Sequence, residues 1–299
     1  MAWNIQKIVD DLQQVRQEWR IQQKSLKEEG GRELPSRTEI KKIMNDLCGV
    51  LFPMRLGPHD LKHQSENVYI AYTLEKTLYA LLEQVKLNLA YDDKYKKLER
   101  DLVQINLLAE EIVRDFAAQL PHLRKILDTD VIAAYEGDPA ARSVDEVLLC
   151  YPGILAMIYH RIAHEFYKKQ LSLLARIIAE LSHSKTGIDI HPGAQIGQGC
   201  FIDHGTGVVI GETCIIGQNV RIYQAVTLGA KRFETDEDGR LQKEYARHPI
   251  VQDNVVIYAG ATILGRITIG QGAVIGGNVW ITQSVEANSF VSQSSLSKS

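Results

Sequence analysis

The chain has 299 residues, 45% of them hydrophobic and 24% charged, which is the composition of an ordinary globular protein of about two domains. Lys and Arg number 34 against 37 Asp and Glu, and the net charge of -3 offers nothing to attract nucleic acid or an anionic membrane. The four cysteines form no C-x-x-C pair, which indicates reduced thiols rather than a disulfide framework or a zinc site. No segment resembles a signal peptide or a membrane span, so we expect a cytoplasmic protein.

Residues 1–186 have the hydrophobic spacing of α-helices. A helix is predicted over residues 4–29, and a capping-box pattern at Ser36 and Glu39 starts a second helix that ends near Leu51. Further helices are predicted over residues 60–90, 94–119, 123–134, 144–149, 153–168 and 170–182. His160 and His164 would share a helix face, but they have no third ligand nearby, so we interpret them as packed side chains.

Residues 187–299 have a different architecture, because 16 of the 22 glycines lie there. A large aliphatic residue opens each of twelve hexads: Ile190, Ile196, Ile202, Ile210, Ile216, Ile222, Val251, Ile257, Ile263, Ile269, Ile275 and Ile281. The residue four positions later is small or β-branched and is predicted to be interior: Ala194, Cys200, Thr206, Cys214, Val220, Val226, Val255, Ala261, Ile267, Ala273, Val279 and Val285. Stacked aliphatic corners with glycine turns predict a parallel β-helix of about four coils, each with three six-residue faces.

Two segments depart from this repeat. The polar excursion at 229–250 is either a mobile loop or an arm that covers a site between subunits. The serine-rich residues 286–299 are predicted to be a flexible tail. The fold class is therefore α+β, with an α-helical domain over 1–186 and a β-helix domain over 187–299.

Chemically reactive side chains interrupt the β-helix at a few places. Asp189 and His204 are 15 residues apart, close to one coil, so they are expected to face each other across adjacent coils. A carboxylate that binds one imidazole nitrogen leaves the other free to act as a general base. A solvated histidine on a coil face is the alternative for His204, and a basic loop end is the alternative for Arg247 and His248. Phosphate-loop, dinucleotide-binding and serine-hydrolase motifs are absent from the sequence.

Several of these segments together resemble the serine O-acetyltransferase family. In the β-helix they are Asp189–Pro192, Asp203–Glu212, Val226–Gly229 and Arg247–Pro249, and in the helical part they are Gly137–Ala140, Tyr151–Gly153 and Arg161–His164. The resemblance extends over residues 130–285 and implies a left-handed β-helix that assembles as a homotrimer or a dimer of trimers, with ligand grooves between neighbouring prisms.

The resemblance also implies residue roles. His204 would be the general base and Asp189 its orienting carboxylate. The substrate would contact Asp138 and Asp203 through its amino group, Arg247 through its carboxylate, and His248 and Glu212 nearby; the pantetheine arm would lie along Gly229, Ala230, Ala259 and Gly260. The family usually has a second glycine at the position of Ala230.

The implied reaction is direct transfer of the acetyl group from acetyl-CoA, as a co-substrate, to the hydroxyl of L-serine. No bound cofactor and no metal are expected. The tail lacks the terminal isoleucine with which some relatives dock onto the sulfhydrylase that uses the product, so no stable complex through the tail is expected.

Three other functions stay open at this point. An acyltransferase for homoserine or a sugar would share His204 but would not need Asp138 and Arg247 as a zwitterion clamp. A zinc hydratase of the same fold needs three converging histidines, and the β-helix offers only His191, His204 and His248. A non-enzymatic scaffold would leave the grouped reactive side chains without a role.

Overall fold

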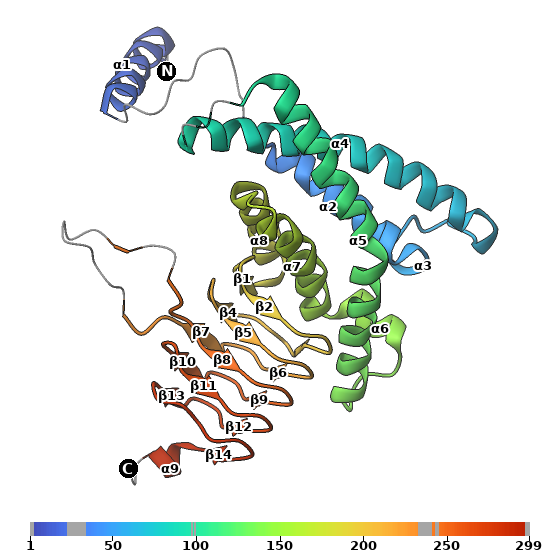
Figure 1. Ribbon diagram of the computed structural model, residues 1–299, viewed down its shortest axis with the longest axis vertical. Coiled ribbons are helices and arrows are strands. Elements are labelled where there is room, and N and C mark those ends of the chain that lie inside the picture. The colour runs from blue at the N-terminus through green and yellow to red at the C-terminus, as the bar shows by residue number, and fades with distance from the viewer. Residues whose placement is uncertain are drawn as a thin grey trace.

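The computed structural model describes residues 3–22, 34–96, 98, 100–232, 241–242 and 245–296 (Figure 1). The chain as far as Thr186 is mainly helical, and from Asp189 it forms a prism of short parallel strands. The helices are α1 (Ile5–Gln22), α2 (Arg37–Leu51), α3 (Pro53–Leu56), the 3-10 turn η1 (His63–Ser65), α4 (Glu66–Lys96), α5 (Leu102–Gly137), α6 (Val144–Cys150), α7 (Pro152–Lys168), α8 (Ser172–Thr186) and the C-terminal α9 (Gln293–Leu296).

The helical pattern predicted most of these elements, with two corrections. The break expected over residues 91–93 is wrong, because α4 continues to Lys96. The expected break between residues 119 and 123 is wrong, because α5 continues through Pro121. Leu120 and Leu123 on either side are buried, and this packing outweighs the hydrogen bond that a proline removes. The predicted extension of the first helix over 23–29 lies outside the described residues.

The expected capping box at Ser36 is only half formed. The Ser36 hydroxyl accepts the Glu39 N–H at 3.4 Å, but the Ser36 N–H donates to the Gln84 side chain at 2.7 Å instead of to Glu39. A complete capping box starts α5, where Asp101 and Gln104 satisfy each other's backbone N–H groups.

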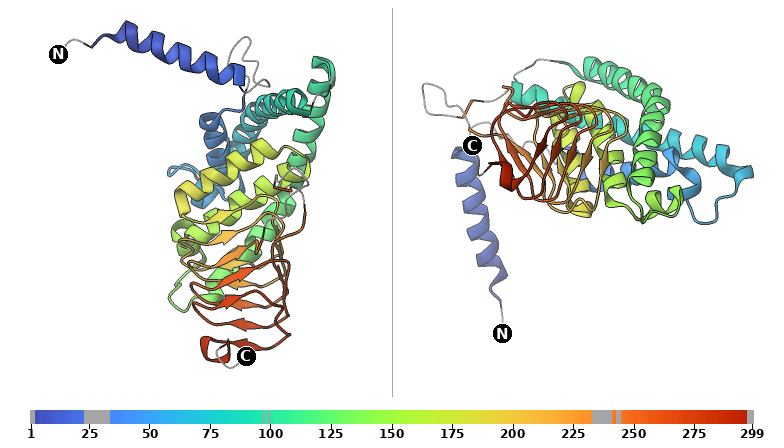
Figure 2. Two further views of the ribbon diagram at one scale, coloured as in Figure 1. Left: turned by 90° about the vertical axis from the view of Figure 1, so that its left-hand side faces the viewer. Right: turned by 90° about the horizontal axis from the view of Figure 1, so that it is seen from below.

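The strands form three parallel sheets, which are the faces of the left-handed β-helix (Figures 1 and 2). The first face contains β1 (Asp189–Ile190), β4 (Val209–Ile210), β7 (Thr227–Gly229), β10 (Thr262–Leu264) and β13 (Trp280–Ile281). The second contains β2 (Gln195–Ile196), β5 (Ile215–Ile216), β8 (Ile250–Val251) and β11 (Thr268–Ile269), and the third contains β3 (Phe201–Ile202), β6 (Arg221–Ile222), β9 (Val256–Ile257), β12 (Val274–Ile275) and β14 (Phe290–Val291).

The hexad openers lie inside this prism as predicted, all buried except Ile196, which is partly buried. The repeat extends further than expected. Leu228 occupies the interior of β7, and β14 pairs with β12, so the flexible tail predicted from residue 286 is wrong as far as Val291. Residues 297–299 of that tail lie outside the described part.

Thr206 is the one predicted interior residue that is exposed, and Val208 is buried in its place. The cause is a two-residue insertion between β3 and β4. The register pairs Asp189 with Val209, a spacing of 20 residues, whereas Val209 pairs with Thr227 at the regular spacing of 18. His204, Gly205 and Gly207 all have positive φ (58°, 82° and 78°), so the insertion forms a bulge on the corner without disturbing the strands beside it.

The helical part rests on the first coil of the prism through α5, α7 and α8. Gly187, at φ 70°, ends α8 and leads directly into β1. The buried Arg161 of α7 pairs with Asp130 of α5 at 2.6 Å and donates to the Gly197 carbonyl at 2.8 Å, which ties both helices to the coil.

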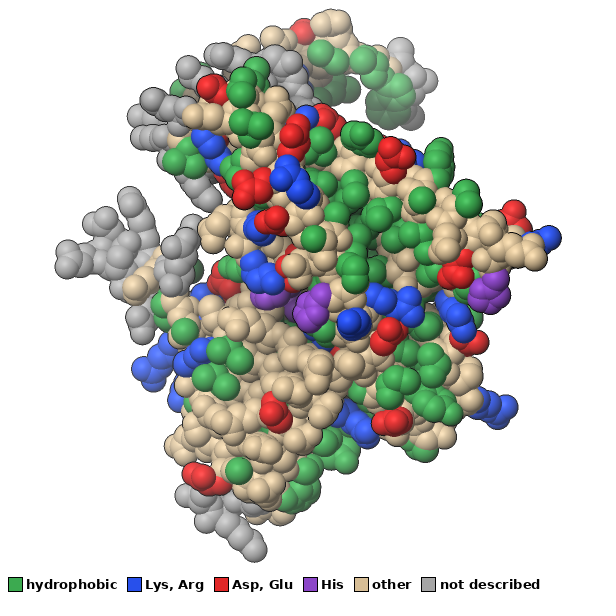
Figure 3. Space-filling view, turned by 45° about the vertical axis from the view of Figure 1, so that its right-hand side comes forward, with side chains coloured by type: hydrophobic (Ala, Val, Ile, Leu, Met, Phe, Trp, Pro, Cys, Tyr) green, Lys and Arg blue, Asp and Glu red, His purple; other side chains and the backbone are tan. Residues whose placement is uncertain are grey.

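Figure 3 shows hydrophobic side chains gathered over the helical part, whereas the visible face of the prism is mainly backbone and polar side chains. Within the described chain, no single helix is long and apolar enough to cross a membrane. The bent pair of α6 and α7 meets the test by length and composition alone.

Candidate active site

The bulge between β3 and β4 presents His204 to solvent. We call residues 203–208, which connect these strands, the β3–β4 corner. The His204 side chain is 68% exposed, and its Nδ1 lies 3.8 Å from a carboxylate oxygen of Asp203, which is itself nearly buried. An inserted, left-handed residue is therefore what lifts this imidazole out of the otherwise flat corner.

Asp138 joins the β3–β4 corner from the helical part. It caps the C-terminus of α5, and its carboxylate accepts the Ala140 N–H at 2.8 Å and the Tyr151 hydroxyl at 2.5 Å. The hydrogen bond from Tyr151 lowers the pKa of Asp138, with further contributions from the Ala140 N–H and from the nearby His204 and Arg221. The same bond raises the pKa of Tyr151 to about 12, so Tyr151 stays a donor.

The local sequence explains why Tyr151 reaches Asp138. Tyr151 is the N-cap of α7, Pro152 fixes the first helical turn, and Gly153 follows. A Cβ at Gly153 would lie 2.1 Å from the Ile202 carbonyl oxygen, so only glycine lets this helix start directly against β3. The close approach places Tyr151 and Asp138 beside Asp203 and His204.

A second polar cluster lies where the chain leaves β4. We call residues 211–214 the β4–β5 corner. Glu212 accepts the Tyr167 hydroxyl at 2.8 Å and an Arg247 guanidinium N–H at 2.5 Å. Burial opposes ionisation of Glu212, but these two hydrogen bonds outweigh it and lower its pKa. Arg247 is thereby held as a fixed cation at the end of the excursion.

His248 is held in one tautomer at the same corner. Its Nδ1 accepts the Thr213 backbone N–H at 3.1 Å and lies 2.9 Å from the Thr213 hydroxyl, which in turn accepts the His248 N–H. Burial, helped by Arg247, lowers the pKa of His248 to about 4. A neutral ring whose Nδ1 accepts must carry its proton on Nε2, so His248 is a hydrogen-bond donor.

His191 shows the same behaviour one coil earlier. Its Nδ1 accepts the Gly193 N–H at 3.0 Å, and Tyr167 packs edge-on against its ring. Burial, followed by the nearby Arg176, lowers its pKa to about 4. His191 therefore belongs to the wall of the β4–β5 corner, on the opposite side of the first face from His204.

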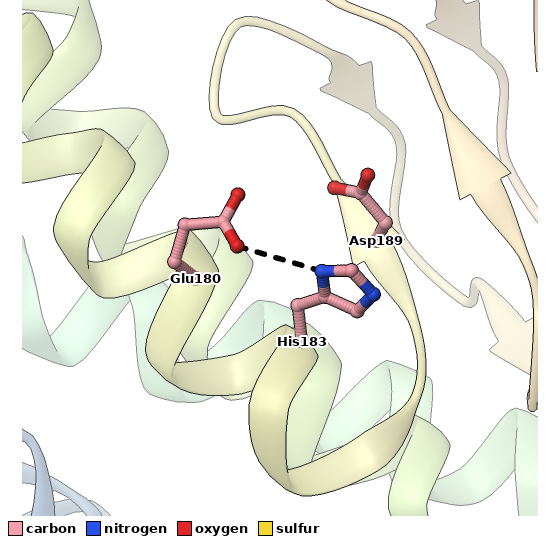
Figure 4. Close-up of side chains that lie close together, drawn as sticks. All are labelled: Glu180, His183 and Asp189. Atoms are coloured by element: carbon pink, nitrogen blue, oxygen red, sulfur yellow. Dashed lines mark ion pairs between the residues drawn. The ribbon is translucent and has the colours of Figure 1, made fainter.

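Asp189 lies on β1, between the two corners. The two inserted residues put Val209 in register with Asp189, so the spacing of 15 residues does not by itself set His204 opposite Asp189. Both side chains are described, and they share no hydrogen bond or ion pair. Asp189 instead faces Glu180 and His183 of α8, with ligand atoms within 4.8 Å of one another (Figure 4). In the described residues this is the only such group of three, and it contains none of His191, His204 and His248.

The residues expected along the pantetheine arm are also divided between corners. Gly229 is the last residue of β7 and Ala230 follows it, on the same edge of the first face as the β4–β5 corner. Ala259 and Gly260 lie in the turn before β10, on the edge of the β3–β4 corner, where Gly260 has φ 73°.

The sequence predicted the members of both clusters but not their separation. Asp138 interacts electrostatically with His204 and Arg221, whereas His248 interacts with Arg247, Glu212 and Arg266. From Gly207 to Glu212 the chain crosses one face of the prism, at most about 17 Å at ~3.3 Å per extended residue. Each corner therefore presents only part of the predicted site.

Comparison with known proteins identifies the family. The chain is 55% identical over 264 residues to "Serine acetyltransferase, plasmid" of Synechococcus elongatus, which covers 88% of this chain and 83% of that protein. The chain belongs to the serine acetyltransferase family. The model for "Bacterial transferase hexapeptide (six repeats)" matches residues 248–283, from the end of the excursion through the hexads that resume at Val251.

Solved serine acetyltransferases have the same architecture. Serine acetyltransferase 1 of Entamoeba histolytica, in complex with L-cysteine, aligns with a TM-score of 0.73 and 41% identity over 83% of this chain and 85% of that one. The enzyme of Neisseria gonorrhoeae, in complex with serine, aligns with a TM-score of 0.54 and 28% identity over 85% of this chain and 94% of that one. The α+β class and the left-handed β-helix predicted for this family member are thus confirmed.

Three supporting residues have no role that was assigned from the sequence: Tyr151, Tyr167 and Thr213. Tyr151 precedes a proline and a glycine at a predicted helix start, which is a usable signal for an N-cap. Tyr167 and Thr213 follow ordinary helix and coil patterns, and only the fold shows that they contact Glu212 and His248.

Proposed function

We propose that this chain transfers the acetyl group of acetyl-CoA to the hydroxyl of L-serine, at sites shared between neighbouring copies of the chain. The main observation in support is that the two corners carry opposite charges. Asp138 and Asp203 lie at one edge of the first face, and Arg247 lies at the other. These are complementary halves of a binding site for an amino acid zwitterion.

The β3–β4 corner suits the α-ammonium group. Asp138 is kept ionised by Tyr151 and the Ala140 N–H, and Asp203 lies beside His204 on the same corner. A carboxylate with a lowered pKa binds a cation without first releasing a proton.

The β4–β5 corner suits the α-carboxylate. Arg247 is oriented by Glu212, and the Nε2–H of neutral His248 adds a second donor. Glu212 then acts as a positioning residue that fixes the guanidinium rather than as a contact of the substrate.

The geometry requires two copies. The ammonium and carboxylate groups of serine are bonded to the same carbon, so serine cannot span one whole face of the prism to reach both corners of a single chain. Flat prism faces favour side-by-side packing of copies, which brings one chain's β3–β4 corner against its neighbour's β4–β5 corner. A homotrimer closes this contact with three equivalent sites. The pantetheine arm would follow the same groove, between Ala259 and Gly260 of one copy and Gly229 and Ala230 of the other.

The chemistry is direct transfer. His204 removes the proton from the serine hydroxyl as that oxygen attacks the thioester carbonyl carbon. The tetrahedral intermediate then expels the CoA thiolate, which takes the proton from His204. An enzyme nucleophile is not needed, and burial raises the pKa of both β-helix thiols, Cys200 and Cys214, to about 12, which keeps them protonated. Asp189, on the face between the corners, is proposed to orient His204 within the assembled site.

Complementation between variants tests the shared site. His204→Ala chains and Arg247→Ala chains are co-expressed with different tags, and the mixed oligomers are purified and assayed for O-acetylserine at low serine. If each site takes one corner from each of two neighbouring chains, roughly a quarter of the sites in random mixtures combine two intact corners and regain activity.

The matched control combines His204→Ala with Asp138→Ala, which damage the same corner, so every site stays defective. If both mixtures stay inactive, the site lies within one chain and the shared arrangement is wrong. Activity of the unmodified chain with homoserine or a sugar in preference to serine would overturn the substrate assignment.

A further inference from the structure

Helix α1 exposes a continuous apolar face. It contains no buried residue. The apolar side chains of this face are Ile5, Ile8, Val9, Leu12, Val15 and Trp19, each between 44% and 61% exposed, and Ile21, outside the face, is 74% exposed. Figure 2 shows α1 extending away from the other helices and the prism. A lone 18-residue helix is only marginally stable in water, and a large exposed apolar strip marks an interaction surface.

The spacing of this strip identifies the kind of partner. Ile5, Ile8, Leu12, Val15 and Trp19 follow one another at intervals of three, four, three and four residues. These are the a and d positions of a heptad repeat, whose period of 3.5 residues is that of a coiled coil. Apart from Ile21, polar side chains cover the opposite side, where Gln6 bonds to Asp10 at 2.9 Å within the helix.

We propose that α1 associates in parallel and in register with α1 of other copies of this chain, as a short three-stranded coiled coil. This inference goes beyond the acetyl-transfer function, because α1 carries none of the proposed site residues. Its apolar seam and its flanking charges both support self-association.

The flanking charges set the direction. With Ile5 at position a, Asp11 occupies g and Arg16 occupies e of the next heptad. In a parallel, in-register pair, position g of one helix faces the following e position of its neighbour, so Asp11 meets Arg16 of the next copy. The two residues flank opposite sides of the seam in their own helix, so they cannot pair within one chain.

An antiparallel arrangement is disfavoured by the same residues. Antiparallel helices place g positions against g positions, and in α1 these are Asp11 and Glu18, which would repel each other. A copy of α1 therefore offers complementary charges in the parallel direction and like charges in the other.

The residues at the seam set the number of strands. Ile5 and Ile8 put isoleucine at both a and d in the first heptad, a combination that favours three strands over two. Leu12 at a, rather than a β-branched residue, also departs from the dimer pattern. Three strands also match the homotrimer proposed for the prism, so that the three α1 helices of one trimer can form one coiled coil.

Disulfide trapping tests the arrangement in the full-length chain. Ile5→Cys is introduced together with Cys150→Ser, which removes the exposed native cysteine. Parallel, in-register helices bring the introduced thiols of two copies together, so mild oxidation should give covalent dimers. Trp19→Cys, at a seam position near the other end, should do the same, and Asp10→Cys, on the outer side, should not. Retained acetyl transfer shows that each variant is folded.

The opposite results overturn the proposal. In antiparallel helices Ile5 lies about 25 Å from its counterpart at ~1.5 Å per residue, so neither seam variant would cross-link with itself. A mixture of Ile8→Cys and Trp19→Cys chains would then form mixed dimers instead. Equal cross-linking of the Ile5→Cys and Asp10→Cys variants would indicate random collision of the helices and would contradict a defined coiled coil.

A charge exchange tests the register separately. Asp11→Arg and Arg16→Asp should each reduce disulfide formation at residue 5, because each places like charges across the contact. The double exchange restores opposite charges and should restore the yield. Loss of cross-linking that the double variant does not recover would contradict the pairing of Asp11 with Arg16.

Discussion

The two corners of the first face are built in contrasting ways. At the β3–β4 corner the proposed base, His204, is 68% exposed and has one charged neighbour at 3.8 Å. At the β4–β5 corner Glu212 and Arg247 are 24% and 20% exposed and are joined at 2.5 Å. The difference separates two tasks: a group that must exchange a proton with the substrate is left open, whereas groups that must hold a carboxylate are fixed beforehand.

The largest effect is expected from His204→Ala. Removing a general base should lower kcat by at least ~100-fold. Because the side chain is exposed and lies on a bulge, the melting temperature should stay close to that of the unmodified protein. Steady-state kinetics and thermal unfolding check both parts. Near-normal turnover would remove His204 from the mechanism.

The clamp residues should affect binding instead. Asp138→Ala and Arg247→Ala should each raise KM for serine by roughly 10- to 100-fold, since each leaves one charge of the zwitterion without its partner. KM for acetyl-CoA should change much less. A solved relative is in complex with L-cysteine, so cysteine should compete with serine. Its inhibition should become weaker in the same two variants. Equal changes in both KM values would contradict the assignment.

Gly211 allows a sharper comparison of the two corners. A Cβ at this position would lie 2.0 Å from the His248 ring, so Gly211→Ala should displace the ring and destabilise the fold by about 1–3 kcal/mol. The double variant Gly211→Ala/His248→Ala removes the obstructing ring and should recover most of that loss. Chemical denaturation of the two single variants and the double variant measures each free energy of unfolding. If the two losses of stability add in the double variant, the ring is not the obstacle.

The smallest effect concerns pH. His191 and His248 have pKa values lowered to about 4, below the value of about 6.5 for an unfolded histidine. Between these values the unfolded chain binds more protons, so stability should fall as pH drops from 6.5 towards 4. His191→Asn/His248→Asn should flatten this part of the stability profile, because asparagine retains an acceptor but does not titrate. An unchanged slope would show that other groups cause the acid sensitivity.

The prism could be predicted almost residue by residue because its interior repeats. The sequence placed all twelve openers in the core, where all but the partly buried Ile196 are buried, but it put Thr206 there as well. The six-residue pattern shows that two residues are inserted between β3 and β4. It does not show that the inserted residues leave the coil as a bulge. The break predicted near Pro121 failed for the opposite reason, since a local signal was overruled by burial of Leu120 and Leu123.

The site was predictable as a set of residues but not as a geometry. Asp138, Asp203, Arg247 and His248 were found through the family resemblance, which does not reveal that one chain holds them in two groups. That division depends on which corner each turn occupies. Spacing alone likewise paired Asp189 with His204, whereas the register of β1 and β4 sets Asp189 beside Val209.

The bulge at His204 has a consequence for engineering. A strict repeat presents the same flat surface at every coil. A side chain can project from that surface only where the six-residue period is interrupted. Here the interruption is confined to one turn, because Val209 and Thr227 return at once to the 18-residue register. We therefore expect that the insertion can be transferred to another corner of the prism. Residues 203–207, transplanted to the corner between β6 and β7, should place a second exposed imidazole one coil further along without unwinding the prism.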